Sequence, residues 1–154
     1  RQRKMFIRDS SDPTNLTARA HLMSAAMMGA TAFQKGLGAI HAISHPIGAI
    51  YNTHHGTTNA VIMLDVLDFN RSKIEDQINI ATNYLGIEGG FTGFKNFIES
   101  LCLDLNIPKT LSELGVKNPN IDLITDIAMR DPSVGGNPVT MTKENTKELI
   151  ETLF

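Results

Sequence analysis

The sequence lacks the features that mark several large classes of protein. Its only cysteine is Cys102, and it has no tryptophan. One cysteine cannot form a disulfide within the chain, so we expect a reducing, cytoplasmic setting. The formal net charge is −2 and no basic stripe is present, which argues against a nucleic-acid partner. No apolar run approaches the length that spans a membrane, and the basic N-terminus is not followed by the apolar core of a signal peptide.

Regular alternation of apolar and polar residues, the mark of a half-buried strand, is also missing. The apolar residues recur instead at three- and four-residue spacing, which predicts helices. The chain has 154 residues, of which 42% are hydrophobic and 19% charged, and this composition suits one globular domain. We therefore predict an all-α bundle of about six or seven helices, with residues 1–154 forming a single helical domain. Because the sequence begins at Arg1 with what resembles the end of a helix around Met5, we expect it to be a fragment of a longer protein.

The first half of the chain carries helix signals separated by breaks. The Ala- and Met-rich segment from Leu16 to Phe33 predicts a helix that is buried on most of its faces. A second helix is expected from Ala39, with a kink or a break at Pro46. Residues 47–57 are rich in Gly, Asn, Thr and His and predict a loop. A helix capped by Thr57 or Thr58 is expected over residues 60–67, although these β-branched residues also suit a strand.

The second half carries stop and start signals. The sequence from Ser72 to Glu75 forms a capping box, which predicts that a new helix starts there and ends at Gly86. Residues 110–114 predict a short turn of helix, and residues 131–138 predict a long exposed loop with a structural role. Three further helices are expected to begin after capping residues, which are Thr92, Asn120 and Thr142.

Histidine is concentrated in one stretch of the sequence. Four of the five histidines lie between Gly36 and Asn70, and they are His41, His45, His54 and His55. His41 and His45 are four residues apart, so they share one face of a helix. A loop could fold a third imidazole over them, and this pattern favours a metal site over chance packing. His54 and His55 are adjacent, so at most one of them is expected to be a ligand, and spacing alone leaves open which.

Other residues in this stretch have simpler interpretations. Asp65 and Asp68 follow the histidines, but a helix cap or a solvated face explains them as well as a metal site does. Gly36 to Ile40 begins like a dinucleotide-binding glycine motif. The position of the last glycine is occupied by His41 and no strand precedes the motif, so we reject a phosphate loop. His21 is interpreted as an ordinary polar position and Cys102 as a core residue.

The stretch GLGAIHAISHPIGAIYNTHHGTTNAVIMLDVLDFN resembles the metal-binding segment of the iron-containing alcohol dehydrogenases. The pattern of that family is approximately GLxHxxxHPxGxxYxxxHGxxNAxxxPxVxxxN. The resemblance extends to the Met/Ala-rich segment before Phe33, to residues 107–116, and to Asp131-Pro132 with Gly136-Asn137-Pro138. It therefore covers essentially the whole chain.

The resemblance implies a set of roles. His41 and His55 match the metal ligands, which usually hold Fe²⁺ and in some members Zn²⁺. His45 matches a histidine beside the nicotinamide and the substrate, which implies a catalytic proton relay. Phe33 matches an aromatic residue that lines the substrate pocket in some members. The implied reaction is hydride transfer between NAD(P) and a short-chain alcohol or aldehyde, with the metal as a Lewis acid.

The departures from the family pattern imply an incomplete enzyme. Members have a further Asp and His ligand, together with an N-terminal half that binds the dinucleotide, and these residues match neither. Leu64-Asp65 stands where many members have Pro followed by His or Tyr, which leaves the substrate open. We expect no dehydrogenase activity from the chain alone, and self-association, as a homo-oligomer, through the surface that the missing half would cover.

Two alternatives to the enzyme fragment remain open at this point. The chain could be a stand-alone, non-catalytic helical module that pairs with a separate dinucleotide-binding chain. It could also be a histidine-rich metal binder with no redox role.

Overall fold

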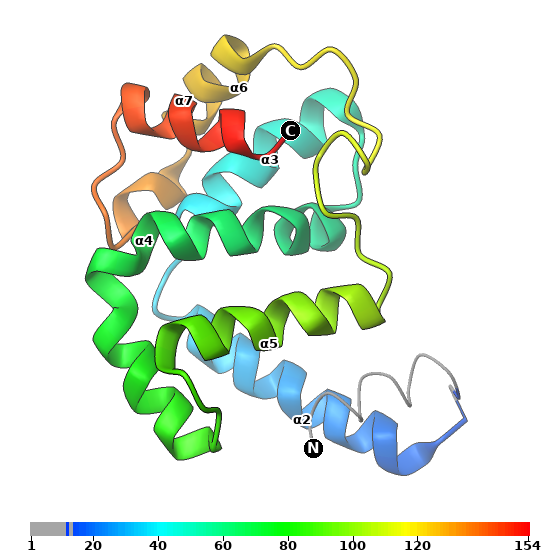
Figure 1. Ribbon diagram of the computed structural model, residues 1–154. Coiled ribbons are helices and arrows are strands. Elements are labelled where there is room, and N and C mark those ends of the chain that lie inside the picture. Colours follow the sequence, from blue (N-terminus) through cyan, green and yellow to red (C-terminus); the bar gives the residue numbers. More distant parts are fainter. Residues whose placement is uncertain (1–11, 13) are drawn as a thin grey trace.

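The computed structural model describes Asp12 and residues 14–154. The expected helix end around Met5 lies outside the described residues. The described part contains six α-helices, one 3₁₀-helix and no strand (Figure 1), so the predicted all-α fold is confirmed. The helices are α2 (Leu16–Phe33), α3 (Ala39–Tyr51), α4 (His55–Leu85), α5 (Gly90–Asp104), α6 (Ile121–Ala128) and α7 (Lys143–Thr152), and the 3₁₀-helix is η1 (Pro132–Gly136).

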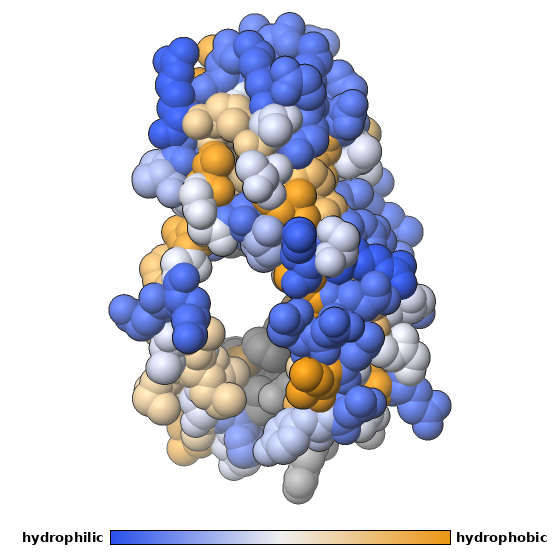
Figure 2. All heavy atoms as spheres, turned by 90° about the vertical axis from the view of Figure 1, so that its left-hand side faces the viewer, coloured by the Kyte–Doolittle hydropathy of each residue, from blue (hydrophilic) through white to orange (hydrophobic). Residues whose placement is uncertain are grey.

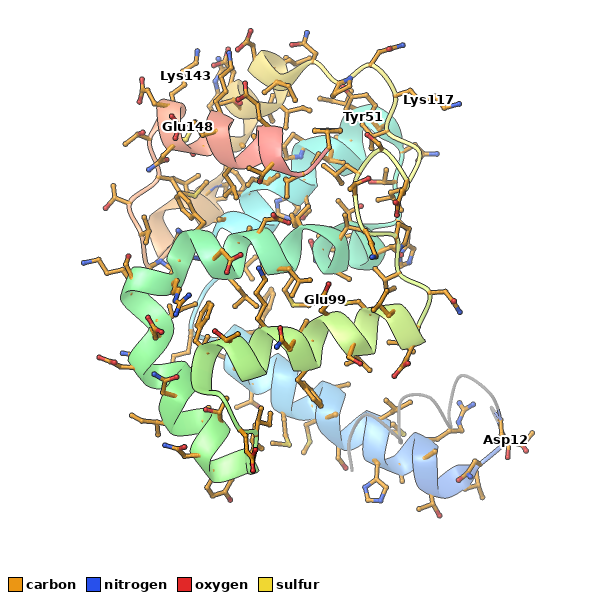
Figure 3. The ribbon with its side chains drawn as sticks, in the orientation of Figure 1. Asp12, Tyr51, Glu99, Lys117, Lys143 and Glu148 are labelled. Atoms are coloured by element: carbon orange, nitrogen blue, oxygen red, sulfur yellow. The ribbon has the colours of Figure 1, made fainter. Side chains whose placement is uncertain are left out.

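The hydrophobic core lies where α3, the first half of α4, α6 and α7 meet. It also takes in residues from the connection between α5 and α6, such as Leu111 and Val116. The residues of this core that are completely inaccessible to solvent are Ala42, Ile43, Ile47, Ile62, Leu111, Ile124 and Ile150. Lys143 and Glu148 of α7 project away from the core (Figure 3). Tyr51, at the end of α3, lies beside the connection to α6, and its hydroxyl accepts a hydrogen bond from the backbone N–H of Asn120 at 3.0 Å.

Helix α2 stands apart from this core. It was predicted to be buried on most faces, and that prediction is wrong for the described residues, because only Ala18 is buried. Met23, Met27 and Met28 are 73%, 67% and 67% exposed. Figure 2 shows open space between the densely packed upper part of the molecule and the lower part, and α2 makes few contacts with the other helices.

Helix α3 passes through Pro46 without a break. Of the predicted kink or break, the break does not occur, and the loop predicted over residues 47–57 is wrong because the helix continues to Tyr51. Proline removes the hydrogen bond that its N–H would donate to the carbonyl of Ala42. Pro46 is buried, however, and the burial of Ile43 and Ile47 against the core keeps the rest of the helix in place. Only residues 52–54 separate α3 from α4, and Asn52 makes the turn in the left-handed conformation with φ 53°.

Helix α4 is longer than predicted at both ends. Its N-cap is His54 rather than Thr57 or Thr58, since the side chain of His54 accepts a hydrogen bond from the backbone N–H of Thr57. The predicted start at Ser72 is wrong, because α4 is continuous from His55 to Leu85. The helix changes direction part-way along its length (Figure 1). The predicted stop at Gly86 is confirmed, with that residue in the left-handed conformation.

The predictions of the remaining helix boundaries are partly confirmed and partly wrong. The N-caps at Asn120 and Thr142 are confirmed, and Thr142 forms a capping box with Asn145. Thr92 is not an N-cap, because α5 begins at Gly90 after the left-handed Gly89. Residues 110–114 form a single turn, in which the backbone N–H of Leu114 donates to the carbonyl of Thr110 at 3.1 Å, in agreement with the predicted short turn of helix. Across Asp12 and residues 14–154, no helix is both long enough and apolar enough to cross a membrane.

Candidate metal centre

The hairpin of α3 and α4 brings three of the four clustered histidines together. His41 and His45 lie one turn apart on α3, and the short turn at residues 52–54 places His55 at the first position of α4. The ring centroids are 5.7 Å apart for His41 and His45, 5.3 Å for His41 and His55, and 5.5 Å for His45 and His55. The predicted cluster of these three side chains is therefore present in the structure.

Two of these imidazoles point the same nitrogen at one amide. The side-chain amide nitrogen of Asn59 lies 3.1 Å from Nε2 of His55 and 3.5 Å from Nε2 of His41. An amide NH₂ group can only donate, so both Nε2 atoms accept and direct their lone pairs toward the same place. The amide oxygen of Asn59 is buried and has no hydrogen-bond partner among the described residues. Such an orphaned acceptor is costly, so a hydrogen-bond donor at this point would be stabilising.

The electrostatic surroundings of His41 favour its neutral form. Burial lowers the pKa of His41 below its ordinary value of 6.5, and the neighbouring His55 and His45 lower it further, while Asp131 acts in the opposite direction. A metal ligand must be the neutral imidazole. The cluster therefore holds His41 in the form that ligation requires.

His45 makes a different contact, with a residue far along the chain. Its Nδ1 lies 2.7 Å from Oδ2 of Asp131, whose side chain is only 11% exposed. Burial alone would raise the pKa of Asp131, but hydrogen bonds from His45 and from Ser133 outweigh burial and hold the pKa below its ordinary value. This carboxylate is a member of the site that the sequence analysis did not identify.

The segment that carries Asp131 is held against the histidine helices by a buried polar network. The amide oxygen of Asn137 accepts hydrogen bonds from the backbone N–H of Ala39 and from the side chain of Asn70, both at 3.0 Å. Its NH₂ group donates to the side chain of Asn70 at 2.8 Å and to the carbonyl of Val139 at 2.7 Å. Gly38, the N-cap of α3, has no side chain, so Asn137 supplies the acceptor for the first turn from a distance. Residues 131–138 are therefore more than the exposed loop that was predicted. Four of the eight are exposed, but the segment contains η1 and is hydrogen-bonded to the start of α3 and to the middle of α4.

The other candidate residues take the following places. Phe33, the last residue of α2, is 54% exposed and meets His41 edge to face, with ring centroids 6.1 Å apart. His54 turns away from the cluster to cap α4, a role that the sequence analysis left unassigned. His21 is exposed on α2, away from the cluster. Asp68 forms an ion pair with Lys95 of α5, which fits the solvated-face interpretation.

Cys102 is partly buried rather than fully in the core. It lines a cavity of about 140 Å³ between α4 and α5, together with Ala60, Leu64 and Ile107. Burial raises the pKa of the thiol, and Glu99 raises it further. A thiol with a raised pKa is a poor nucleophile at neutral pH.

The donor set fits a metal in kind but not in number. Imidazole nitrogens are common ligands of Zn²⁺ and Fe²⁺, and the two converging Nε2 atoms are of this type. Among Asp12 and residues 14–154, no group of three or more His, Cys, Asp and Glu side chains is arranged to hold a metal ion. A protein site of three or four ligands would therefore need donors in addition to His41 and His55.

Comparison with known proteins agrees with this fold. Residues 6–154 match the family model described as "Fe-containing alcohol dehydrogenase family, C-terminal". The chain is 32% identical over 126 residues to the lactaldehyde reductase of Escherichia coli (strain K12), covering 77% of this chain and 33% of that protein. It is 30% identical over 149 residues to the NADPH-dependent butanol dehydrogenase of Clostridium saccharobutylicum, covering 89% of this chain and 38% of the relative.

A solved structure shows the same fold. The crystal structure of a 1,3-propanediol oxidoreductase superposes with a TM-score of 0.90 at 24% identity, covering 99% of this chain and 42% of that one. This chain belongs to the Fe-containing alcohol dehydrogenase family and corresponds to its C-terminal helical domain. It spans about a third to two fifths of the length of the relatives that it matches.

Proposed function

We propose that this chain is the metal-binding C-terminal part of an NAD(P)-dependent alcohol dehydrogenase that interconverts short-chain alcohols and aldehydes or ketones. The observation that carries the proposal is the convergence of the Nε2 atoms of His41 and His55, 3.5 Å and 3.1 Å from one amide nitrogen, beside a third imidazole. Family membership gives this constellation its chemistry, since relatives in the family are named as alcohol and aldehyde oxidoreductases.

In this proposal His41 and His55 supply two imidazole ligands to Fe²⁺ or Zn²⁺. A metal held there would supply Lewis-acid polarisation of the alcohol oxygen, which lowers the pKa of the hydroxyl. The remaining protein ligands and most of the NAD(P) site would come from a part of the protein that these 154 residues do not contain.

His45 is the proposed proton-transfer group. Its ring is 5.5 Å from that of His55 and 5.7 Å from that of His41, measured between centroids, so it borders the proposed metal position without sharing the Asn59 contact. Phe33 lies beside His41 and is proposed to form one wall of the substrate pocket. An aromatic wall excludes water from the place where the alcohol is bound, and this strengthens the electrostatic interactions there.

The experiment uses the longest open reading frame that contains this chain, beside the 154-residue chain alone. The longer protein is expected to contain tightly bound metal and to oxidise short-chain alcohols with NAD(P). Replacing His41 or His55 by Ala is expected to remove both the metal and the activity, whereas His21→Ala, on the exposed face of α2, should change neither. Full activity and metal content in the His55→Ala protein would refute the ligand assignment.

The isolated chain provides the complementary measurement. We expect it to bind Zn²⁺ or Fe²⁺ weakly, because two ligands are too few, and to show no NAD(P)-dependent turnover. Turnover by the chain alone would contradict the proposal. Tight, stoichiometric metal binding by the chain alone would favour a metal-binding module without a redox role.

A further inference from the structure

The contact between Asp131 and His45 determines which nitrogen of the imidazole carries the proton. Oδ1 of Asp131 accepts a hydrogen bond from the backbone N–H of Ser133 at 2.8 Å, and Oδ2 faces Nδ1 of His45 at 2.7 Å. An ionised carboxylate can only accept, so the proton of this hydrogen bond lies on Nδ1. In the neutral ring the other nitrogen, Nε2, is then unprotonated.

The carboxylate cannot easily turn away from this contact. Asp131 is the N-cap of η1, so its position is coupled to the first turn of that helix. The segment that follows is fixed by the hydrogen bonds of Asn137 to Ala39 and Asn70. A side chain at Gly136 would overlap the carbonyl oxygen of Leu37, which shows how closely this segment approaches the residues before α3. The two partners are 86 residues apart in sequence, and their contact depends on this packing.

The ring of His45 is also oriented by its neighbours. It stacks on the ring of His55 with an interplanar angle of 18° and meets the ring of His41 at 68°. Nδ1 of His45 is directed to Asp131, and the ring contacts with His55 and His41 do not require a proton on Nε2. The three contacts together therefore fix the plane of the ring and the nitrogen that is protonated.

We propose that Asp131 is a positioning residue, which holds His45 as the Nδ1–H tautomer so that Nε2 is the nitrogen available to accept a proton. Asp131 acts through His45 and is not itself a proton-transfer group. The meaning of this arrangement for catalysis rests on the proposed function, but the tautomer is a property of the chain itself. A carboxylate that fixes an imidazole in this way is a common device in sites where histidine transfers protons.

The test is the ¹⁵N NMR spectrum of the histidine side chains in the 154-residue chain, with chelator present and at a pH where the imidazoles are neutral. Long-range ¹H–¹⁵N correlations distinguish a protonated ring nitrogen from an unprotonated one. In the wild-type chain we expect His45 to show a protonated Nδ1 and an unprotonated Nε2, with the Nδ1–H form in roughly tenfold excess or more, because hydrogen bonds to a carboxylate are the strong ones.

Asp131→Asn is the decisive variant. Its single oxygen is expected to keep the hydrogen bond from the backbone N–H of Ser133, so its NH₂ group faces Nδ1 of His45 and must donate to it. The tautomer of His45 should therefore invert to Nε2–H, while the capping of η1 is retained. Asp122→Asn is the matched control, since Asp122 is exposed on α6 and pairs with Lys147; this change should leave the His45 signals unchanged.

Either of two results would overturn the proposal. One is a wild-type His45 that is mainly Nε2–H, and this measurement stands even if the Asn variant fails to fold. The other is a folded Asp131→Asn chain with the wild-type tautomer. Because neither metal nor NAD(P) is present, failure of the dehydrogenase proposal would leave this measurement unaffected, and the converse also holds.

Discussion

Removing the side chain of Asn137 should be among the most damaging single changes to the fold. Its amide makes four hydrogen bonds, one to the backbone N–H that begins α3, two to the side chain of Asn70, and one to the carbonyl of Val139. Asn70 is buried, so water cannot readily replace the lost partner. The Asn137→Ala variant therefore leaves several polar groups unsatisfied inside the protein.

The size of the effect follows from the number of orphaned groups. The donor of the Asn70 amide loses its partner, the backbone N–H of Ala39 loses its acceptor, and the carbonyl of Val139 loses its donor. The amide oxygen of Asn70 keeps one hydrogen bond, from the backbone N–H of Val139 at 3.3 Å. A buried polar group without a partner costs about 1–3 kcal/mol, and partial hydration of the two backbone groups lowers their share. We expect a loss of about 3–5 kcal/mol in the free energy of unfolding, a large fraction of the roughly 5–15 kcal/mol of a typical domain.

Urea unfolding followed by circular dichroism measures this loss. The midpoint should fall strongly in Asn137→Ala, whereas Asn96→Ala, on the exposed face of α5, should stay within about 0.5 kcal/mol of the wild type. A double-mutant cycle with Asn70→Ala should show that the two losses are not additive, because both changes remove the two hydrogen bonds between these side chains. A loss below about 1 kcal/mol, or additive losses, would refute the reasoning that this network ties η1 to α3 and α4.

Three further predictions concern other parts of the chain. Gly136→Ala should destabilise the chain by about 1–3 kcal/mol, because its Cβ would overlap the carbonyl oxygen of Leu37, whereas Gly135→Ala meets nothing within 4 Å and should be nearly neutral; equal effects in thermal unfolding would contradict this. His41 has a folded-state pKa below 6.5, so the unfolded chain takes up the proton first as the pH falls. The stability that comes from neutral His41 is therefore present above pH 6.5 and is lost as the pH falls through the folded-state pKa. The His41→Gln variant should show a smaller loss in this range when the urea midpoint is plotted against pH. The exposed apolar side chains of α2 should make the chain self-associate. Met27→Glu should weaken that association roughly tenfold or more in light scattering, because burying one such side chain is worth about 1.5–3 kcal/mol. A wild-type chain that stays monomeric at high concentration would count against this prediction.

The sequence was sufficient to predict the helical class and the histidine cluster because both depend on local spacing. Any two residues four apart on a helix share a face, as His41 and His45 do. Gly86, Asn120 and Thr142 mark helix ends by their own backbone and side-chain chemistry. The same local rules failed where tertiary packing overrides them. The capping box at Ser72 lies inside a continuous helix, since a helix start needs a break before it as well as a cap.

The members of the site that the sequence analysis missed are those that act across long separations. Asp131 meets His45 across 86 positions, and Asn137 meets Asn70 across 67. Asp131-Pro132 reads as a turn signal in any protein, and nothing in its spacing points to a histidine on another helix. Asn59 was within reach of prediction, because it lies four residues after His55 on the same helix and so shares its face.

The histidines of the candidate site are held in place by the surrounding fold. His41, His45 and His55 are carried by α3 and α4, which pack tightly in the core, and Asp131 and Asn59 hold specific nitrogens of these rings in place. Such a preordered set of ligands loses little conformational entropy when a metal binds. We infer that weak metal binding by this chain would reflect the number of ligands and not their disorder. Supplying an additional carboxylate or imidazole ligand beside the Nε2 atoms of His41 and His55 should therefore raise metal affinity far more than any change that stiffens the fold.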